Sequence, residues 1–127
     1  MRVFTVKAFS RWAKKQTLGN EELNTAIQEI INGLYDARLG GNLYKKRVAL
    51  QGQGKRGSTR TLIAFKKNDK AFFIYGFDKG SRSNITEKEE KLLKVFGNTL
   101  LNWSDKELNK RIKDGELVEI TEVQDGR

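Results

Sequence analysis

The sequence contains no cysteine and no histidine among its 127 residues. Without cysteine the chain forms no disulfide, has no thiol nucleophile and offers no thiolate ligand to a metal. Without histidine it lacks the commonest metal ligand and the side chain that most often transfers protons near neutral pH. We therefore expect no metal and no cofactor, and any catalysis must use Lys, Arg, Tyr, Asp or Glu.

The sequence also lacks any apolar run that approaches the length of a membrane span. Its N-terminal residues have neither the long apolar core nor the small-residue cleavage site of a secretion signal. Apolar residues make up 37% of the chain and fall in periodic runs, which excludes wholesale disorder. We expect a soluble, cytoplasmic protein with a single domain over residues 1–121 and a flexible C-terminal tail over residues 122–127.

Positive charge is abundant and is concentrated in residues 43–82. This segment holds eleven Lys or Arg and two acids, so its formal charge of +9 equals that of the whole chain. The other residues carry equal numbers of both signs. A neutral frame with one basic segment predicts a polyanionic partner, for which nucleic acid, an anionic membrane and an acidic protein are the candidate classes.

Hydrophobic periodicity predicts an α+β protein. Alternating residues predict strands at 3–6, 43–50, 58–67, 71–77 and 116–121. Helical spacing predicts helices at 7–16, at 105–112, from the cap at Thr86 onward, and for about four turns from Asn20 through Tyr35. We expect these helices to pack on one face of a small, largely antiparallel sheet.

Three glycines in the basic segment match the spacing G-x-G-x-x-G: Gly52, Gly54 and Gly57. A dinucleotide-binding motif needs a helix after these glycines, whereas a strand is predicted here. A kinase domain does not fit into a chain of this length. A flexible hairpin loop explains the glycines but not the adjacent Lys55 and Arg56. Two cations beside exposed backbone N–H groups favour binding of a phosphate.

A second group of cations follows the strands of the same segment: Lys45, Arg47, Arg60, Lys79 and Arg82. The alternation of a strand places Lys45 and Arg47 on one face, and Arg60 joins them if the neighbouring strand is in register. A solvated surface is the usual role of such residues. Their clustering favours an anion instead, because concentrated positive charge repels itself unless a phosphate or carboxylate lies there. Tyr44 and Tyr75 have the chemistry to stack on bases, although packing in or beside the core is the commoner role.

Four stretches of the basic segment, residues 43–49, 52–57, 59–65 and 71–77, together resemble the RelE/HigB-like toxins of bacterial toxin–antitoxin systems, and in particular their HigB-like branch. Residues 11–15 and 114–119 are similar to the same branch, so the resemblance covers nearly the whole chain. It implies a small, twisted antiparallel sheet with two N-terminal helices packed on it and C-terminal helices.

The resemblance implies an mRNA interferase, an endoribonuclease that needs no metal. Such toxins cut messenger RNA, typically in the ribosomal A site, by attack of a 2′-hydroxyl on the adjacent phosphate. The products are a 2′,3′-cyclic phosphate and a 5′-hydroxyl. The implied partners are mRNA, the ribosome with its rRNA, and a cognate antitoxin, a small helix-turn-helix protein; no membrane is implied.

The resemblance also implies roles for individual residues. Lys45 and Arg47 occupy two basic positions of the first long strand, and one of them would orient or deprotonate the 2′-hydroxyl. Arg60 would stabilise the charged phosphorane. Lys79 and Arg82 flank the position that often protonates the leaving oxygen, which is occupied here by glycine. The residues implied in holding RNA or its phosphates are Lys46, Gly54, Lys55, Arg56 and Gly57.

Two other classes of function remain open from the sequence. A protein of the same fold could poison DNA gyrase without cutting RNA, as the related ParE branch does, or bind nucleic acid without cleaving it. A more distant alternative is a phosphate-loop enzyme that acts on a small nucleotide.

Overall fold

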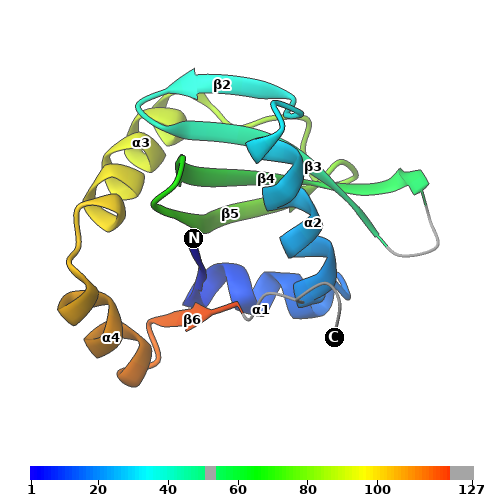
Figure 1. The fold of residues 1–127 in the computed structure, drawn as a ribbon. Coiled ribbons are helices and arrows are strands. Elements are labelled where there is room, and N and C mark those ends of the chain that lie inside the picture. The colour runs from blue at the N-terminus through cyan, green and yellow to red at the C-terminus, as the bar shows by residue number, and fades with distance from the viewer. Residues whose placement is uncertain (51–53, 121–127) are drawn as a thin grey trace.

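The computed structural model describes residues 1–50 and 54–120, and the predicted tail at residues 122–127 lies outside these ranges. The elements, in chain order, are β1 (Arg2–Val6), α1 (Lys7–Lys15), α2 (Asn20–Ile31), β2 (Ala37–Gly40), β3 (Leu43–Leu50), β4 (Gly54–Lys66), β5 (Lys70–Asp78), α3 (Glu87–Leu101), α4 (Asp105–Lys113) and β6 (Leu117–Glu119) (Figure 1). No helix in the described part of the chain combines the length and apolar character needed to cross a bilayer.

The strands form one six-stranded sheet in the order β2-β3-β4-β5-β1-β6. All neighbouring pairs are antiparallel except β1 and β5, which are parallel. The chain therefore returns its C-terminal strand β6 to the edge beside β1, where Val118 faces Thr5. This is the α+β architecture that the sequence predicts, with β4 and β5 at the centre.

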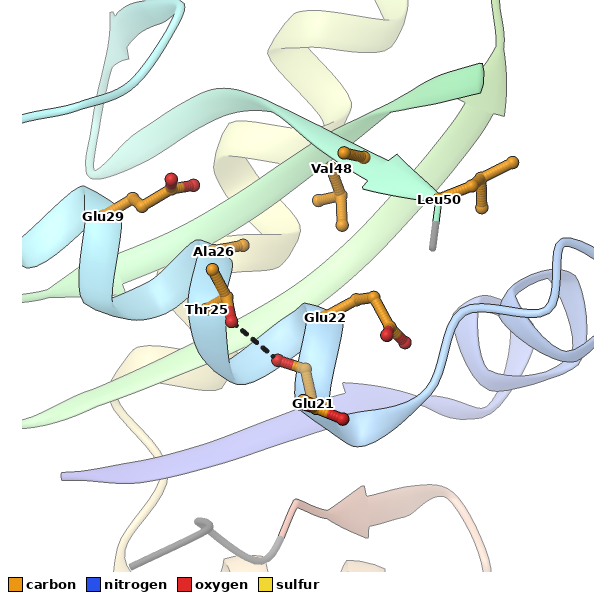
Figure 2. Close-up of a pocket in the computed structure, with 8 residues that line it drawn as sticks. Glu21, Glu22, Thr25, Ala26, Glu29, Val48 and Leu50 are labelled. Carbon is orange, nitrogen blue, oxygen red and sulfur yellow. Dashed lines mark hydrogen bonds between the residues drawn. The ribbon is translucent and has the colours of Figure 1, made fainter. Parts of the chain in front are cut away.

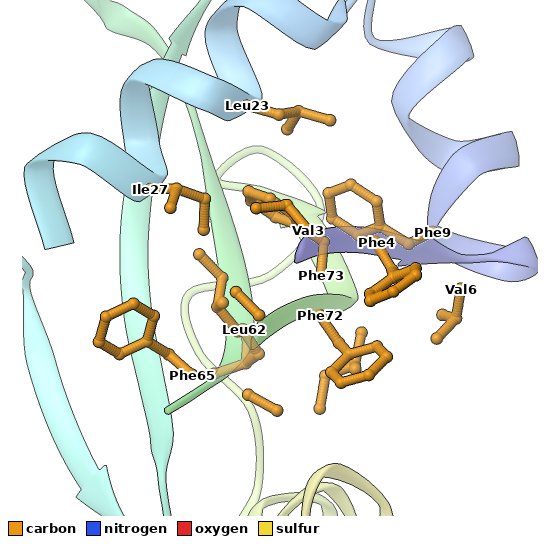
Figure 3. Close-up of a cluster of buried hydrophobic side chains, with 14 of the residues drawn as sticks. Val3, Phe4, Val6, Phe9, Leu23, Ile27, Leu62, Phe65, Phe72 and Phe73 are labelled. Carbon is orange, nitrogen blue, oxygen red and sulfur yellow. The ribbon is translucent and has the colours of Figure 1, made fainter. Parts of the chain in front are cut away.

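One face of the sheet is covered by the two N-terminal helices. The ring of Phe9 in α1 lies 5.2 Å from that of Phe73 in β5, centre to centre. Leu23 and Ile27 of α2 point toward the same layer (Figure 3). Gly76 of β5 also faces α1, because a Cβ built there would overlap the ring of Trp12. Apolar burial on this face is the main stabilising contribution of α1 and α2.

The opposite face is covered in part by α3. Gly97 lies so close to β4 that a Cβ built on it would be 2.9 Å from the Cβ of Ala64. Ala64 points away from its neighbour Ile63, which shares the α1 face with Phe73. The prediction that all helices pack on one face is therefore wrong. A small residue in the buried stripe of α3 lets this helix approach the second face closely.

The second predicted helix is shorter than expected, and one strand was not predicted. α2 ends at Ile31 and is followed by Gly33 with φ of 83°, a left-handed conformation that stops the helix. The apolar spacing continues through Leu34 and Tyr35, but both side chains are exposed, at 59% and 39%. Residues 37–40 then form β2, an edge strand that pairs with β3.

The glycine-rich stretch is partly a strand. β4 begins at Gly54, four residues before the predicted start, and Gly54 pairs with Leu50 of β3. The prediction of a loop is therefore wrong from Gly54 onward, whereas the assignment of Gly54 and Gly57 to phosphate binding stays a prediction. Gly52, the remaining glycine of the motif, lies outside the described residues.

Candidate nucleic-acid interface

Three of the predicted cations lie together on the α3 side of the sheet. Arg47 of β3 and Arg60 of β4 are directly opposite each other. Cross-strand partners point to the same side, and Lys45 shares it because it lies two residues before Arg47. Ala64 on the same side of β4 approaches α3, which identifies the face. Lys45, Arg47 and Arg60 are called the cation face below.

The cation face is anchored at one edge by an acid that the sequence did not single out. Nε of Arg47 donates to Oδ1 of Asp36 at 3.1 Å, and the backbone N–H of Arg47 donates to Oδ2. Two like charges directly opposite each other repel, so Asp36 offsets part of the cost of placing Arg47 beside Arg60. The Arg47 side chain remains 46% exposed and therefore accessible to an anion.

Arg82 lies next to this group but is held by the fold. Its Nη1 donates to the Tyr75 hydroxyl at 3.1 Å and to Oε2 of Glu89 at 2.9 Å, and its Nη2 donates to Oε1 of Glu89 at 2.5 Å. Its Nε donates to the carbonyl of Asn84 at 2.9 Å. Four of the five guanidinium N–H groups are thus engaged within the protein.

Glu89 connects this network to the start of α3. It accepts from Arg82 and from the backbone N–H of Thr86 at 2.8 Å, while the Thr86 hydroxyl accepts from the backbone N–H of Glu89. Hydrogen bonds from Arg82, and then from Thr86, lower the pKa of the Glu89 carboxyl to about 2. The hydrogen bond to Glu89 likewise raises the pKa of Arg82 above its ordinary value. The sequence predicted the helix cap but not the second role of Glu89.

An irregularity in β5 decides which side chains face the cations. Leu62 of β4 is opposite Tyr75, whereas the next residue, Ile63, is opposite Phe73, so β5 carries one extra residue, Ile74, at this point. A bulge of this kind changes the alternation of the strand. As a result Tyr75 lies on the α3 side, in the row of the sheet that also holds Lys45.

The remaining predicted site residues are dispersed. Lys46 lies on the opposite face, where its Nζ is 3.0 Å from Oε1 of Glu29 in α2 and its side chain is only 12% exposed. Lys79 is exposed in the turn after β5. The backbones of Lys55 and Arg56 belong to β4, beyond Arg60 on the same strand.

The two tyrosines that could stack on bases have different surroundings. Tyr44 is 8% exposed and its ring packs against those of Phe65 and Tyr35, so its role is in the core. Tyr75 is half-buried and lines a cavity of about 170 Å³ together with Glu89, Leu92 and Leu93.

A second cavity, of about 280 Å³, lies between α2 and the end of β3 (Figure 2). The residues that line it include three glutamates, Glu21, Glu22 and Glu29. It is on the face of the sheet opposite the cations, since it includes Val48 and Ala26. Negative charge at this cavity repels phosphates, so the cation face is the better site for a polyanion.

The chemistry available at the cation face is that of anion binding. Guanidinium groups bind phosphate oxygens through paired hydrogen bonds, and an ammonium group adds a point charge. Within residues 1–50 and 54–120, no three Asp or Glu side chains converge as metal ligands. The cations, the Tyr75 hydroxyl and the Glu89 carboxylate are the polar groups that the fold gathers here.

Comparison with known proteins identifies the family of the chain. No curated protein matches the chain. Residues 1–120, nearly the whole length, match the family described as the RelE toxin of the RelE/RelB toxin–antitoxin system. The chain belongs to the RelE toxin family.

Proposed function

We propose that this toxin is an mRNA interferase of the HigB-like branch, which cuts messenger RNA on the ribosome. An antitoxin, which we take to be a small helix-turn-helix protein, holds it inactive. The observation that carries the proposal is the facing pair of Arg47 and Arg60 on an accessible side of the sheet. A ribosome offers both rRNA and mRNA to such a surface, and release of counterions from phosphates favours the contact.

In the proposed reaction the 2′-oxygen of one nucleotide attacks the adjacent phosphorus, and the bond from phosphorus to the 5′-oxygen breaks. The 2′-hydroxyl loses a proton and the 5′-oxygen gains one, so no water, metal or cofactor is consumed. Arg47 and Arg60 would stabilise the extra negative charge of the phosphorane, which is often the largest catalytic contribution in such reactions. We assign orientation of the 2′-hydroxyl to Lys45.

The environments of the other cations refine the assignment. Arg82 has one guanidinium N–H left after its contacts with Glu89, Tyr75 and Asn84, so we assign it to positioning rather than to a direct phosphate clamp. Lys79, exposed beside it in the turn, is the cation we assign to the leaving oxygen. We assign Lys46 no role in RNA binding because its side chain faces α2.

Mapping RNA ends after controlled expression tests this proposal. We expect new 5′-hydroxyl ends inside coding regions within minutes of induction, and we expect them to vanish with Arg60→Ala. Lys106→Ala, which removes an exposed cation of α4, is the matched control and should cut as the wild type does. Growth arrest with intact mRNA and induced DNA damage would instead identify a gyrase poison of the same fold.

A further inference from the structure

The cavity beside the cation face has the features of a site for a flat aromatic ligand. It is lined by Tyr75 of β5 and by three residues of α3, Glu89, Leu92 and Leu93, and its exposed lining is almost wholly apolar. Its volume of about 170 Å³ is below the roughly 300–1,000 Å³ of sites for drug-sized ligands. One aromatic side chain with aliphatic neighbours is a surface on which a single planar ring can stack.

Tyr75 is held in one orientation before any ligand arrives. Its hydroxyl accepts from Nη1 of Arg82, and its ring lies 6.1 Å from that of Phe77. Arg82 is itself fixed by Glu89 and lies over Phe77 at 5.8 Å. A ring fixed in this way loses little conformational entropy when a ligand binds, which favours affinity.

The sheet register places this ring close to the cations. Lys45, Leu62 and Tyr75 form one row across β3, β4 and β5, and Arg60 is in the adjacent row. Neighbouring strands are about 4.8 Å apart, so the backbones of Lys45 and Tyr75 are separated by about 10 Å. The bulge at Ile74 is what turns Tyr75 to this side. A ligand that contacts both the cation face and the ring of Tyr75 must carry an anionic group and a planar ring a few bonds apart.

We propose that the cavity between Tyr75 and Leu92 binds one base of the RNA strand whose phosphates contact the cation face. The inference rests on the proposed function only in taking RNA as the ligand. Stacking on Tyr75 would hold one nucleotide, and the neighbouring phosphate would then lie over Arg47 and Arg60. Aromatic platforms beside positive grooves bind single-stranded RNA in this way.

Binding of a synthetic RNA that cannot be cut tests the proposal. The probe is a 2′-O-methyl hexanucleotide, together with six copies that each lack a different base. Affinities are measured by fluorescence anisotropy at low ionic strength. Wild-type protein is expected to bind one of the six abasic copies about tenfold more weakly than the intact strand, and the others with little change.

Two substitutions at Tyr75 connect this loss to the cavity. Tyr75→Ala should bind the intact strand about tenfold more weakly and should no longer distinguish the sensitive abasic copy, since both changes remove the same stacking contact. Tyr75→Phe keeps the ring and should retain most of the discrimination. Leu92→Ser, at a side chain that is 61% exposed, changes the cavity wall without endangering the fold and should weaken the same discrimination.

The proposal is overturned if no single base matters to binding, if Tyr75→Ala still discriminates against the same abasic copy, or if wild-type protein does not bind the strand at all. These outcomes would leave the cavity and the exposed apolar residues of α3, Leu92, Val95 and Phe96, to a protein partner. The assay involves no cleavage, so an absence of RNA cutting in cells would refute the proposed function without affecting this result.

Discussion

The two faces of the sheet provide different environments for adjacent charged residues of the same strand. Lys46 and Arg47 are neighbours on β3, yet Lys46 is nearly buried against Glu29 under α2, whereas Arg47 is half-exposed beside Arg60. The α1–α2 face is closed by aromatic and aliphatic packing. The α3 face is closed where α3 packs against the sheet, and it is accessible at Arg47.

This difference shows how one strand can serve stability and binding together. Alternation assigns odd and even positions of β3 to opposite faces, so a run of three cations is divided between two environments. On the closed face, which α1 and α2 cover, the charge of Lys46 is neutralised by Glu29. On the open face, which α3 covers in part, Arg47 and Arg60 lie directly opposite each other, and Asp36 forms an ion pair with Arg47.

The largest expected effect is that of Arg47→Ala, which removes one guanidinium from the open face. The loss of one preorganised charge donor lowers the cleavage rate by about 10²–10³-fold in comparable sites. The measurement is the rate of RNA cleavage by purified protein or on programmed ribosomes. Asp36→Asn keeps Arg47 and removes its partner, so it should reduce the rate much less; equal losses in the two variants would contradict the account.

Gly76→Ala tests the closed face. The added methyl group would overlap the ring of Trp12, so either α1 or the β5 backbone must shift. Overpacking of this kind typically lowers the free energy of unfolding by about 1–3 kcal/mol. Chemical denaturation measures the loss. Gly97→Ala is the counterpart on the open face, where about 1 kcal/mol of helix propensity offsets the contact with Ala64, and we expect a smaller change.

The salt dependence of RNA binding reports the number of phosphates that the open face contacts. For single strands the slope of log K against log salt is about −0.7 per phosphate contact. Arg60→Ala should therefore make the slope less negative by about 0.7. A titration at several salt concentrations measures it. An unchanged slope would mean that Arg60 does not contact a phosphate.

Acid pH tests the link between the open face and α3. The pKa of Glu89 is lowered to about 2 by Arg82, so this pair stabilises the fold fully above about pH 4.5 and loses its contribution as the pH falls through about 2. The midpoint temperature of thermal unfolding of the wild-type protein should therefore fall as the pH is lowered between these values. The Glu89→Gln variant should have a lower midpoint at neutral pH and should show less of this decrease. Parallel curves for the two proteins would show that the pair contributes nothing.

Much of the fold could be predicted because local rules suffice for it. The caps at Thr86 and Ser104 set the starts of α3 and α4, and the alternation of residues 43–50 gave β3 with the correct faces. The end of α2 was misjudged because Leu34 and Tyr35 continue a helical spacing beyond Gly33, where the backbone has already turned.

The arrangement of the candidate site depends on long-range features that no local pattern reports. The bulge at Ile74 reverses the side on which Tyr75 lies, and simple alternation cannot reveal one extra residue. Asp36 meets Arg47 only because β2 pairs with β3. The capping box at the start of α3 already explains Glu89, so nothing further in the sequence indicates its contact with Arg82.

Paired substitutions on the two faces test the central claim most directly. Arg60→Ala removes a cation from the open face, and Lys46→Met removes one from the closed face while retaining its packing. Each is expressed under tight control, and new 5′-hydroxyl ends in cellular mRNA are counted. The account predicts that the ends disappear with Arg60→Ala and persist with Lys46→Met. Persistence of the ends with Arg60→Ala, or their loss with a folded Lys46→Met, would contradict it.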